Sequence, residues 1–406
     1  MPRITNIEVA QKNLPVRIVL LALAIVIAIG AFAYGFTKLL GADPGWTIIE
    51  ATSTELNCSE DFILNYNLGA GEASATAESK ALKVLYSQMA VDAYRIFYND
   101  YESDDLHNIR YLNEHINQAI TVDPALHKAL SEIVNAGNRN IYLAPVYAQY
   151  MQLLVCETDL EAGQYDPQRQ PETKAYITEV AKFASDPAMI NLEILEGDQV
   201  RLNVSAEYLS FAESNEMEYF LDFSWMRNAF IADYFAEKLI ENNFTNGYVA
   251  SFDGYTRNLC AANMLFSLNV FHRVGQDVRI PATMNYRGGC SVVMLRDFPV
   301  GEDDRWCYYA FEDGRIANLL IDPADGEEKS AVSSMICYAQ NESCSQILLA
   351  MAPVFIADAM DTAKVNDKMN QGIYTVYADG SAVYTNDPLL DISIYETFAY
   401  TKLPIK

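Results

Sequence analysis

Residues that could carry out acid–base, nucleophilic or metal chemistry are scattered along this chain. No two of its four histidines share the spacing of a metal-binding pair; they are His107, His115, His127 and His272. The sequence contains no GxSxG, GxGxxG, GxxxxGKS/T or HExxH motif. The acidic runs at 100–105 and 322–328 lack the glycine that an EF-hand loop needs at its sixth position, and such runs are typical of a solvated face. These motifs alone therefore name no reaction.

The seven cysteines also give no clear chemistry. None of them forms a CxxC pair, so zinc ribbons and thioredoxin-like redox motifs are unsupported. Cys337 and Cys344 bracket a six-residue segment and could close a small disulfide loop in an oxidising compartment. Buried free thiols are the alternative reading for each cysteine.

Hydrophobic periodicity and capping residues predict the elements that must position any site. Asp123 supplies an N-cap and Gly137 a stop for one helix, and Ser224 is expected to cap a helix that starts at Trp225. Pro353 is expected to kink or break an apolar helix. The predicted helices are 78–97, 123–134, 171–184, 225–241 and 347–356, with a strand at 61–66.

Two hairpins complete the predicted elements. They cover 194–202 and 374–384 and turn at Gly197-Asp198 and Asp379-Gly380. Because helices and strands mix without a βαβ rhythm, the sequence predicts an α+β fold of mixed sheets flanked by helices.

Composition restricts the class of protein. Of the 406 residues, 51% are hydrophobic and 20% are charged, which excludes disorder, collagen and coiled coil. The formal net charge is −26, and a surface so negative repels phosphate backbones, so nucleic acid is not an expected partner.

The N-terminal 40 residues differ from the rest. Residues 18–36 form an unbroken apolar run of 19, long enough for a membrane-spanning helix, and residues 1–40 carry a net charge of +3. The positive-inside rule then predicts a cytoplasmic segment 1–16, a single-pass anchor 17–40 in the cell membrane, a linker 41–59 and an extracytoplasmic domain 60–406. A cleaved signal peptide ending near Ala31-Phe32-Ala33 is the alternative.

A succession of short segments carries a family resemblance. The sequence contains, in this order, NIRYLNE at 108–114, ITVDPAL at 120–126, LDFSWMRNAFIAD at 221–233, LLIDPADG at 319–326 and the final Asp-Gly hairpin. In this order the chain resembles the ApbE family, the FAD:protein FMN transferases, over roughly residues 60–390. The resemblance implies the ApbE α+β fold and an activity that splits FAD and attaches FMN to a Ser or Thr of a target protein. Magnesium would neutralise the pyrophosphate in that reaction.

The resemblance can be carried over residue by residue. The family's flavin-nucleotide positions that keep a fitting residue, and that it therefore suggests for FAD, are Asn113, Asp222, Asp253, Gly254, Asp322, Pro323 and Gly326. The family's catalytic Lys and His positions are replaced by Asn228 and Leu319. Ser224 and Trp225 replace two glycines where the backbone must approach a nucleotide closely.

The metal-binding segment has two possible registers. Counting from the preceding strand places it at 345–350, where Gln346 and Ala350 replace the family's Asp and Thr and remove its ligands. The letters of 357–363 match better and would supply Asp358 and Thr362, but they lie too close to the last hairpin. The first register fits the spacing, and magnesium is expected only under the second.

These replacements lead to three functional hypotheses. The first is a membrane-anchored, extracytoplasmic ApbE-like protein that has lost FMN transfer and acts by binding a partner or a flavin nucleotide. The resemblance suggests a flavoprotein or a membrane electron-transfer complex as that partner. The second is an active, divergent transferase that uses Asp358 and Thr362. The third is an acidic envelope binding protein unrelated to flavin.

Overall fold

The computed structural model describes residues 42–71, 73–102 and 106–406. The predicted segments 1–16 and 17–40 lie outside this part of the chain, and no helix within it is long and apolar enough to cross a membrane. The described residues form two units: 42–46 with 67–71 and 73–81, and 47–66 with 82–102 and 106–406. In the small unit the Gly69 N–H donates to the Glu78 carboxylate at 2.7 Å.

A nine-stranded sheet is the centre of the larger unit. Its order is β1-β2-β6-β7-β10-β13-β14-β15-β17, antiparallel from β2 to β15, with β17 parallel to β15. All residues of β10 and β13 are buried, as expected of strands covered on both faces. The strands are β1 Gly45–Ile49, β2 Phe62–Leu68, β6 Gly247–Ser251, β7 Tyr255–Asn258, β10 Ser291–Arg296, β13 Ser334–Ala339, β14 Tyr374–Asp379, β15 Ala382–Thr385 and β17 Thr401–Pro404.

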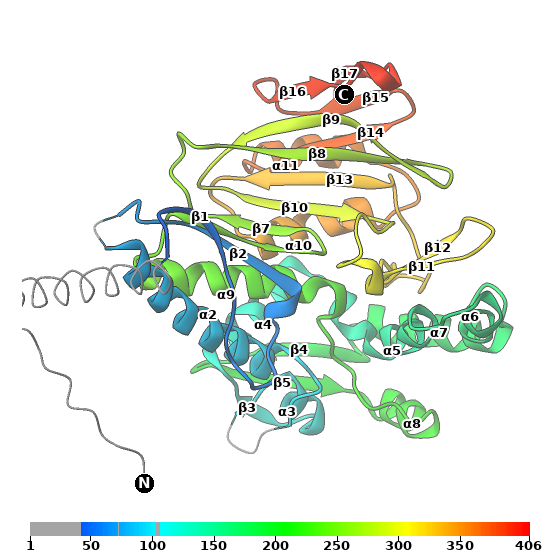
Figure 1. The fold of residues 1–406 in the computed structure, drawn as a ribbon. Helices are drawn as coiled ribbons and strands as arrows, with labels where there is room; N and C mark the ends of the chain where they lie inside the picture. Colours follow the sequence, from blue (N-terminus) through cyan, green and yellow to red (C-terminus); the bar gives the residue numbers. More distant parts are fainter. Residues whose placement is uncertain (1–41, 72, 103–105) are drawn as a thin grey trace, which may run out of the picture. The chain divides into compact units, whose positions relative to one another are not determined.

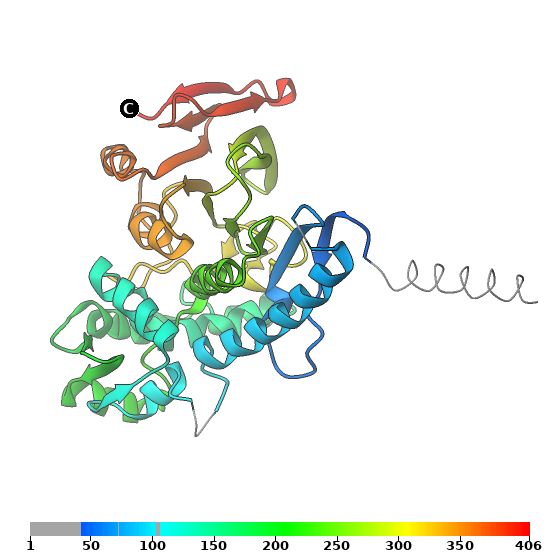
Figure 2. The same cartoon turned by 90° about the vertical axis from the view of Figure 1, so that its left-hand side faces the viewer.

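Two layers cover the middle of this sheet. One is the helix α10, Cys344–Phe355, which packs on β10 and β13. The other is a three-stranded sheet in the order β16-β9-β8, which packs on β13 and β14 through β8 (Figures 1 and 2). Its strands are β8 Leu265–Val274, β9 Asp277–Arg287 and β16 Asp391–Ile394. The apolar side chains between the strands form one core cluster.

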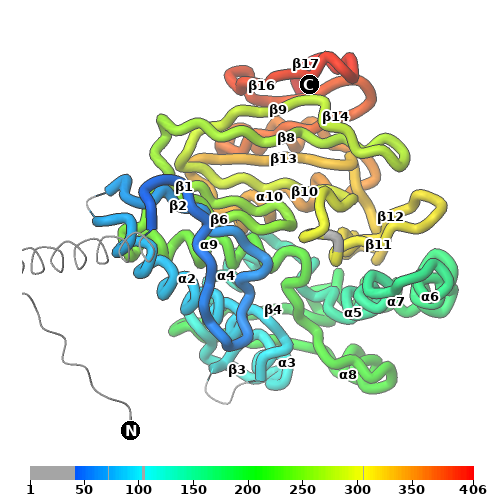
Figure 3. The backbone as a smooth tube through the Cα atoms, viewed as in Figure 1, coloured from blue at the N-terminus to red at the C-terminus, as the bar shows by residue number. Residues whose placement is uncertain are grey.

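A helical region lies beside the sheets and contains α5, α7 and α8 (Figures 1 and 3). It also includes a small sheet in the order β3-β5-β4, and α5 packs on α7. The strands are β3 Ala119–Thr121, β4 Ile190–Ile194 and β5 Gln199–Val204, and the pair β11 Tyr309–Ala310 and β12 Ile316–Ala317 lies further along the chain. The remaining helices are α2 Ala75–Phe97, α3 Ile109–Glu114, α4 Pro124–Ala136, α5 Ala144–Leu154, α6 Asp159–Tyr165, α7 Pro171–Ser185, α8 Ala206–Ser214, α9 Arg227–Glu241 and α11 Thr362–Met369.

The predicted α+β class and most predicted elements are confirmed. Asp123 caps α4 by accepting the Ala125 N–H at 2.8 Å, and Gly137 ends that helix at φ +65°. The hairpins β4–β5 and β14–β15 form where they were predicted. The segment 41–59, expected as a linker, contains β1.

Two predictions about local structure are wrong, and one open alternative is decided. Ser224 does not cap a helix, because it opens a 3-10 turn, η3 Ser224–Met226, and α9 begins only at Arg227. Pro353 lies in the last turn of α10, which continues to Phe355 without a break. The possible pairing of Cys337 with Cys344 is not formed: all seven cysteines are free thiols.

Candidate functional site

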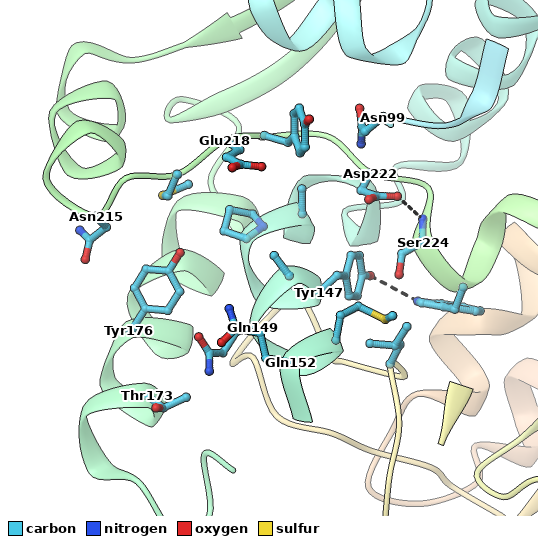
Figure 4. A pocket seen from close by; sticks show the side chains of 18 of the residues that line it. Asn99, Tyr147, Gln149, Gln152, Thr173, Tyr176, Asn215, Glu218, Asp222 and Ser224 are labelled. Atoms are coloured by element: carbon cyan, nitrogen blue, oxygen red, sulfur yellow. Dashed lines mark hydrogen bonds between the residues drawn. The ribbon is translucent and has the colours of Figure 1, made fainter. Parts of the chain in front are cut away.

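A cleft of about 830 Å³ lies in the helical region of the larger unit (Figure 4). Its walls are α5, the first turns of α7, and the connection 215–225 between α8 and α9. Leu319, Ser224 and Trp225 all line it. The fold therefore brings together three of the positions at which the sequence departs from the ApbE motifs.

Trp225 lines the cleft and is held in place by two hydrogen bonds. Its indole Nε1–H donates to the Tyr147 hydroxyl at 3.3 Å (Figure 4). Its carbonyl accepts from the Tyr255 hydroxyl at 3.0 Å. Tyr147 comes from α5 and Tyr255 from β7, so the tryptophan joins the helical region to the large sheet. These hydrogen bonds hold Trp225, which the resemblance aligns with a glycine of the family motif.

The backbone beside Trp225 keeps the conformation of a glycine. Ser224 has φ +47°, in the left-handed region, where a residue with a Cβ pays about 1–2 kcal/mol. The Ser224 N–H donates to Asp222 Oδ1 at 2.6 Å, which closes a tight turn (Figure 4). The left-handed backbone that the resemblance led us to associate with glycine is therefore adopted here by a serine.

Asn113 holds the backbone that leads into this turn. Its side-chain oxygen accepts the N–H groups of Phe220 and Leu221 at 3.0 and 2.9 Å, and its Nδ2 donates to the Leu221 carbonyl at 2.9 Å. Asn113 is buried and does not line the cleft. Its contacts position the connection that carries Asp222, a role that the sequence did not reveal.

Asp253 lines a small pocket next to the cleft and is hydrogen-bonded to Asn228. Asn228 Nδ2 donates to Asp253 Oδ2 at 3.0 Å, while the buried Asp253 Oδ1 has no partner among the described residues. Burial raises the pKa of Asp253 to about 6. Trp225 and Leu319 line this pocket too. The neighbouring Gly254 has φ +118°, and a Cβ there would lie 2.4 Å from the Met294 carbonyl oxygen, so its role is close packing.

The segment with Asp322, Pro323 and Gly326 forms a turn away from the cleft. Asp322 accepts the Ala324 N–H and the Lys329 ammonium group. Gly326 lines a separate cavity of about 190 Å³. Of the LLIDPADG motif only Leu319, at its start, reaches the cleft.

Neither predicted metal register supplies a set of metal ligands. Gln346 is exposed and caps α10, since its Oε1 accepts the Ser343 N–H at 2.8 Å; Ala350, one turn further on α10, has no ligand atom in its side chain. Asp358 has an 87% exposed side chain with Lys329 Nζ 3.7 Å away, and Thr362 starts α11. Within the described ranges no three His, Cys, Asp or Glu side chains are grouped to hold a metal ion. At the first register the residues therefore do not fit magnesium, whereas the second register keeps one carboxylate, Asp358, and one hydroxyl, Thr362.

The cleft is strongly acidic. Among the described residues that line it, Arg227 is the only basic one, against the carboxylates of Asp100, Glu172, Glu216, Glu218 and Asp222. Arg227 lies 3.9 Å from Asp222 and its guanidinium stacks on the Tyr98 ring. The other four carboxylates form no ion pair with a described residue. Sequence reasoning missed them as a group because they come from three separate segments.

Comparison with known proteins tests the fold. No protein-family model matches the chain, and no curated protein matches it in sequence. Two solved structures cover 88% of it: the ApbE protein of Thermotoga maritima, with 12% identity and a TM-score of 0.54, and the flavin transferase ApbE of Vibrio cholerae, with 11% identity and a TM-score of 0.52. The chain has the ApbE fold. The match spans 98% and 99% of those two chains, so the predicted resemblance is confirmed at the level of the fold.

Proposed function

We propose that this chain is an ApbE-fold binding protein that no longer transfers FMN. The observation that carries the proposal is Trp225, which lines the cleft and is held there by Tyr147 and Tyr255. The sequence resemblance aligns this residue with a motif glycine. A nucleotide that packs on the backbone of this turn would meet the indole ring.

The negative charge of the cleft also supports the loss of FMN transfer. The pyrophosphate of FAD carries two negative charges, and each pair of like charges 6 Å apart repels by about 0.7 kcal/mol in water and by more at a protein surface. Among the described residues that line the cleft there are five carboxylates and one arginine, which already neighbours Asp222. A magnesium ion could offset this repulsion, but Gln346 and Ala350 offer it no carboxylate.

The proposal includes the membrane anchor and the extracytoplasmic location of the domain that the sequence predicts. The apolar run 18–36 and the change from a basic N-terminus to an acidic remainder support an anchor with the ApbE-fold domain on the outer side of the cell membrane. There the domain would bind a partner such as a flavoprotein or a membrane electron-transfer complex.

An FMN-transfer assay tests the loss of activity. The full chain is incubated with FAD, magnesium and an acceptor peptide that contains Ser and Thr, and the Vibrio cholerae flavin transferase serves as the positive control. We expect no fluorescent flavin on the peptide. Covalent flavin at a rate within 100-fold of the control would refute the proposal.

If transfer is observed, a variant identifies its source. The double substitution Asp358→Ala and Thr362→Ala would abolish the transfer only if the second register supplies the metal site. An FAD titration without acceptor then separates retention of the nucleotide from a protein unrelated to flavin.

A further inference from the structure

We infer that the acidic cleft binds a lysine- or arginine-rich peptide segment of the partner protein. This inference rests on the proposed function and specifies the chemistry of its partner. It starts from the carboxylates of Glu172, Glu216 and Glu218, which line one cleft and form no ion pair with a described residue. Asp100 lines the same cleft and interacts electrostatically with Arg227.

The remaining lining explains why cationic side chains suit the cleft. Aromatic rings line it at Tyr147, Tyr176, Tyr219, Trp225 and Trp306, and the Trp306 side chain is half exposed. Ammonium and guanidinium groups bind favourably over such rings, and their aliphatic stems pack against apolar surface. Met217 and Leu319 supply apolar surface in the same cleft.

Two amide side chains favour a peptide over a simple polyamine. Gln149 and Gln152 lie one turn apart on α5, and both line the cleft (Figure 4). Neither amide group makes a hydrogen bond with a described residue. A carboxamide offers both a donor and an acceptor, which complement the C=O and N–H groups of a peptide backbone. A polyamine has only donors once it is protonated.

Calorimetric titration of the full chain in an uncharged detergent tests this inference. The probes are a peptide of four alternating Lys-Gly units, the same peptide with acetylated lysines, and spermine. We expect the lysine peptide to bind, the acetylated peptide to bind at least 10-fold more weakly, and added salt to weaken binding because the contacts are ionic. Absence of binding by the lysine peptide, or tighter binding of spermine, would overturn the inference.

Two variants with the same change in net charge separate the effect of the cleft carboxylates on binding from the effect of the chain's net charge. Glu216→Gln with Glu218→Gln removes two exposed carboxylates from the rim, and we expect the lysine peptide to bind about 3- to 30-fold more weakly. Glu196→Gln with Glu213→Gln removes two exposed carboxylates that do not line the cleft. This control should change the affinity by less than 2-fold; an equal loss in both variants would overturn the inference.

Tryptophan fluorescence gives a second readout. The chain has three tryptophans, of which Trp225 and Trp306 line the cleft. In a Trp46→Phe chain the lysine peptide should change the emission, and the acetylated peptide should not. The transfer assay is independent of this experiment: peptide binding together with FMN transfer would refute only the proposed function, and absence of both would refute only the inference.

Discussion

The buried carboxyl group of Asp253 leads to a prediction that depends on pH. Its Oδ2 accepts from Asn228 and its buried Oδ1 has no partner among the described residues, so the ionised form is poorly solvated. Burial raises the pKa of this group from 3.8 to about 6. We predict that Asp253→Asn stabilises the folded chain at neutral pH, because an amide keeps the shape and the Asn228 hydrogen bond but carries no charge.

The sign and the size of this stability difference follow from proton linkage. A raised pKa in the folded state means that the folded chain binds more protons than the unfolded chain between pH 3.8 and 6, so the contribution of Asp253 to stability falls as the pH rises through this window. A difference of roughly two pKa units corresponds to about 3 kcal/mol when the shift is fully expressed. At pH 4 the Asp253 carboxyl group is already ionised in part of the unfolded chains. The unfolding free energy of Asp253→Asn relative to the unmodified chain should therefore grow by about 2 kcal/mol between pH 4 and pH 7.

Urea unfolding of both chains at several pH values measures this difference. Asp367→Asn, at an exposed position on α11, is the matched control for the loss of one carboxylate. The unfolding free energy of the control should track that of the unmodified chain across the range. A stability difference for Asp253→Asn that stays constant from pH 4 to pH 7 would refute the reasoning, because the carboxyl group would then titrate alike in both states.

Two further predictions concern packing around the site. Asn113→Ala leaves the buried N–H groups of Phe220 and Leu221 without their acceptor. The unfolding free energy, measured by urea unfolding, should therefore fall by about 2–4 kcal/mol. A loss below about 1 kcal/mol would contradict the role of Asn113 in holding this connection. Gly254→Ala should destabilise by more than about 3 kcal/mol, since its Cβ would strike a carbonyl oxygen of β10. The control Gly380→Ala, also at positive φ but with nothing within 4 Å, should cost about 1 kcal/mol, and equal melting temperatures for the two variants would disprove the clash.

The acidic cleft illustrates what motif reading could not find. Asp100 follows α2, Glu172 starts α7, and Glu216 and Glu218 lie after α8. No spacing rule connects these residues, since the chain between them is folded into separate helices and a small sheet. Asn113 shows the converse, because a motif suggested a cofactor residue and the structure places its side chain on the backbone of the neighbouring connection.

Elements determined by neighbouring residues were predictable from the sequence by itself. Asp123 and Gly137 bound α4, and Gly197 and Asp198 turn a hairpin, because capping and turn energies depend on residues within one turn of each other. The order of weak motifs was also sufficient to predict the fold. Only the tertiary structure decided the character of the site. The fixed Trp225 and the shared acidic cleft arise from contacts between distant segments, whose energies no local pattern contains.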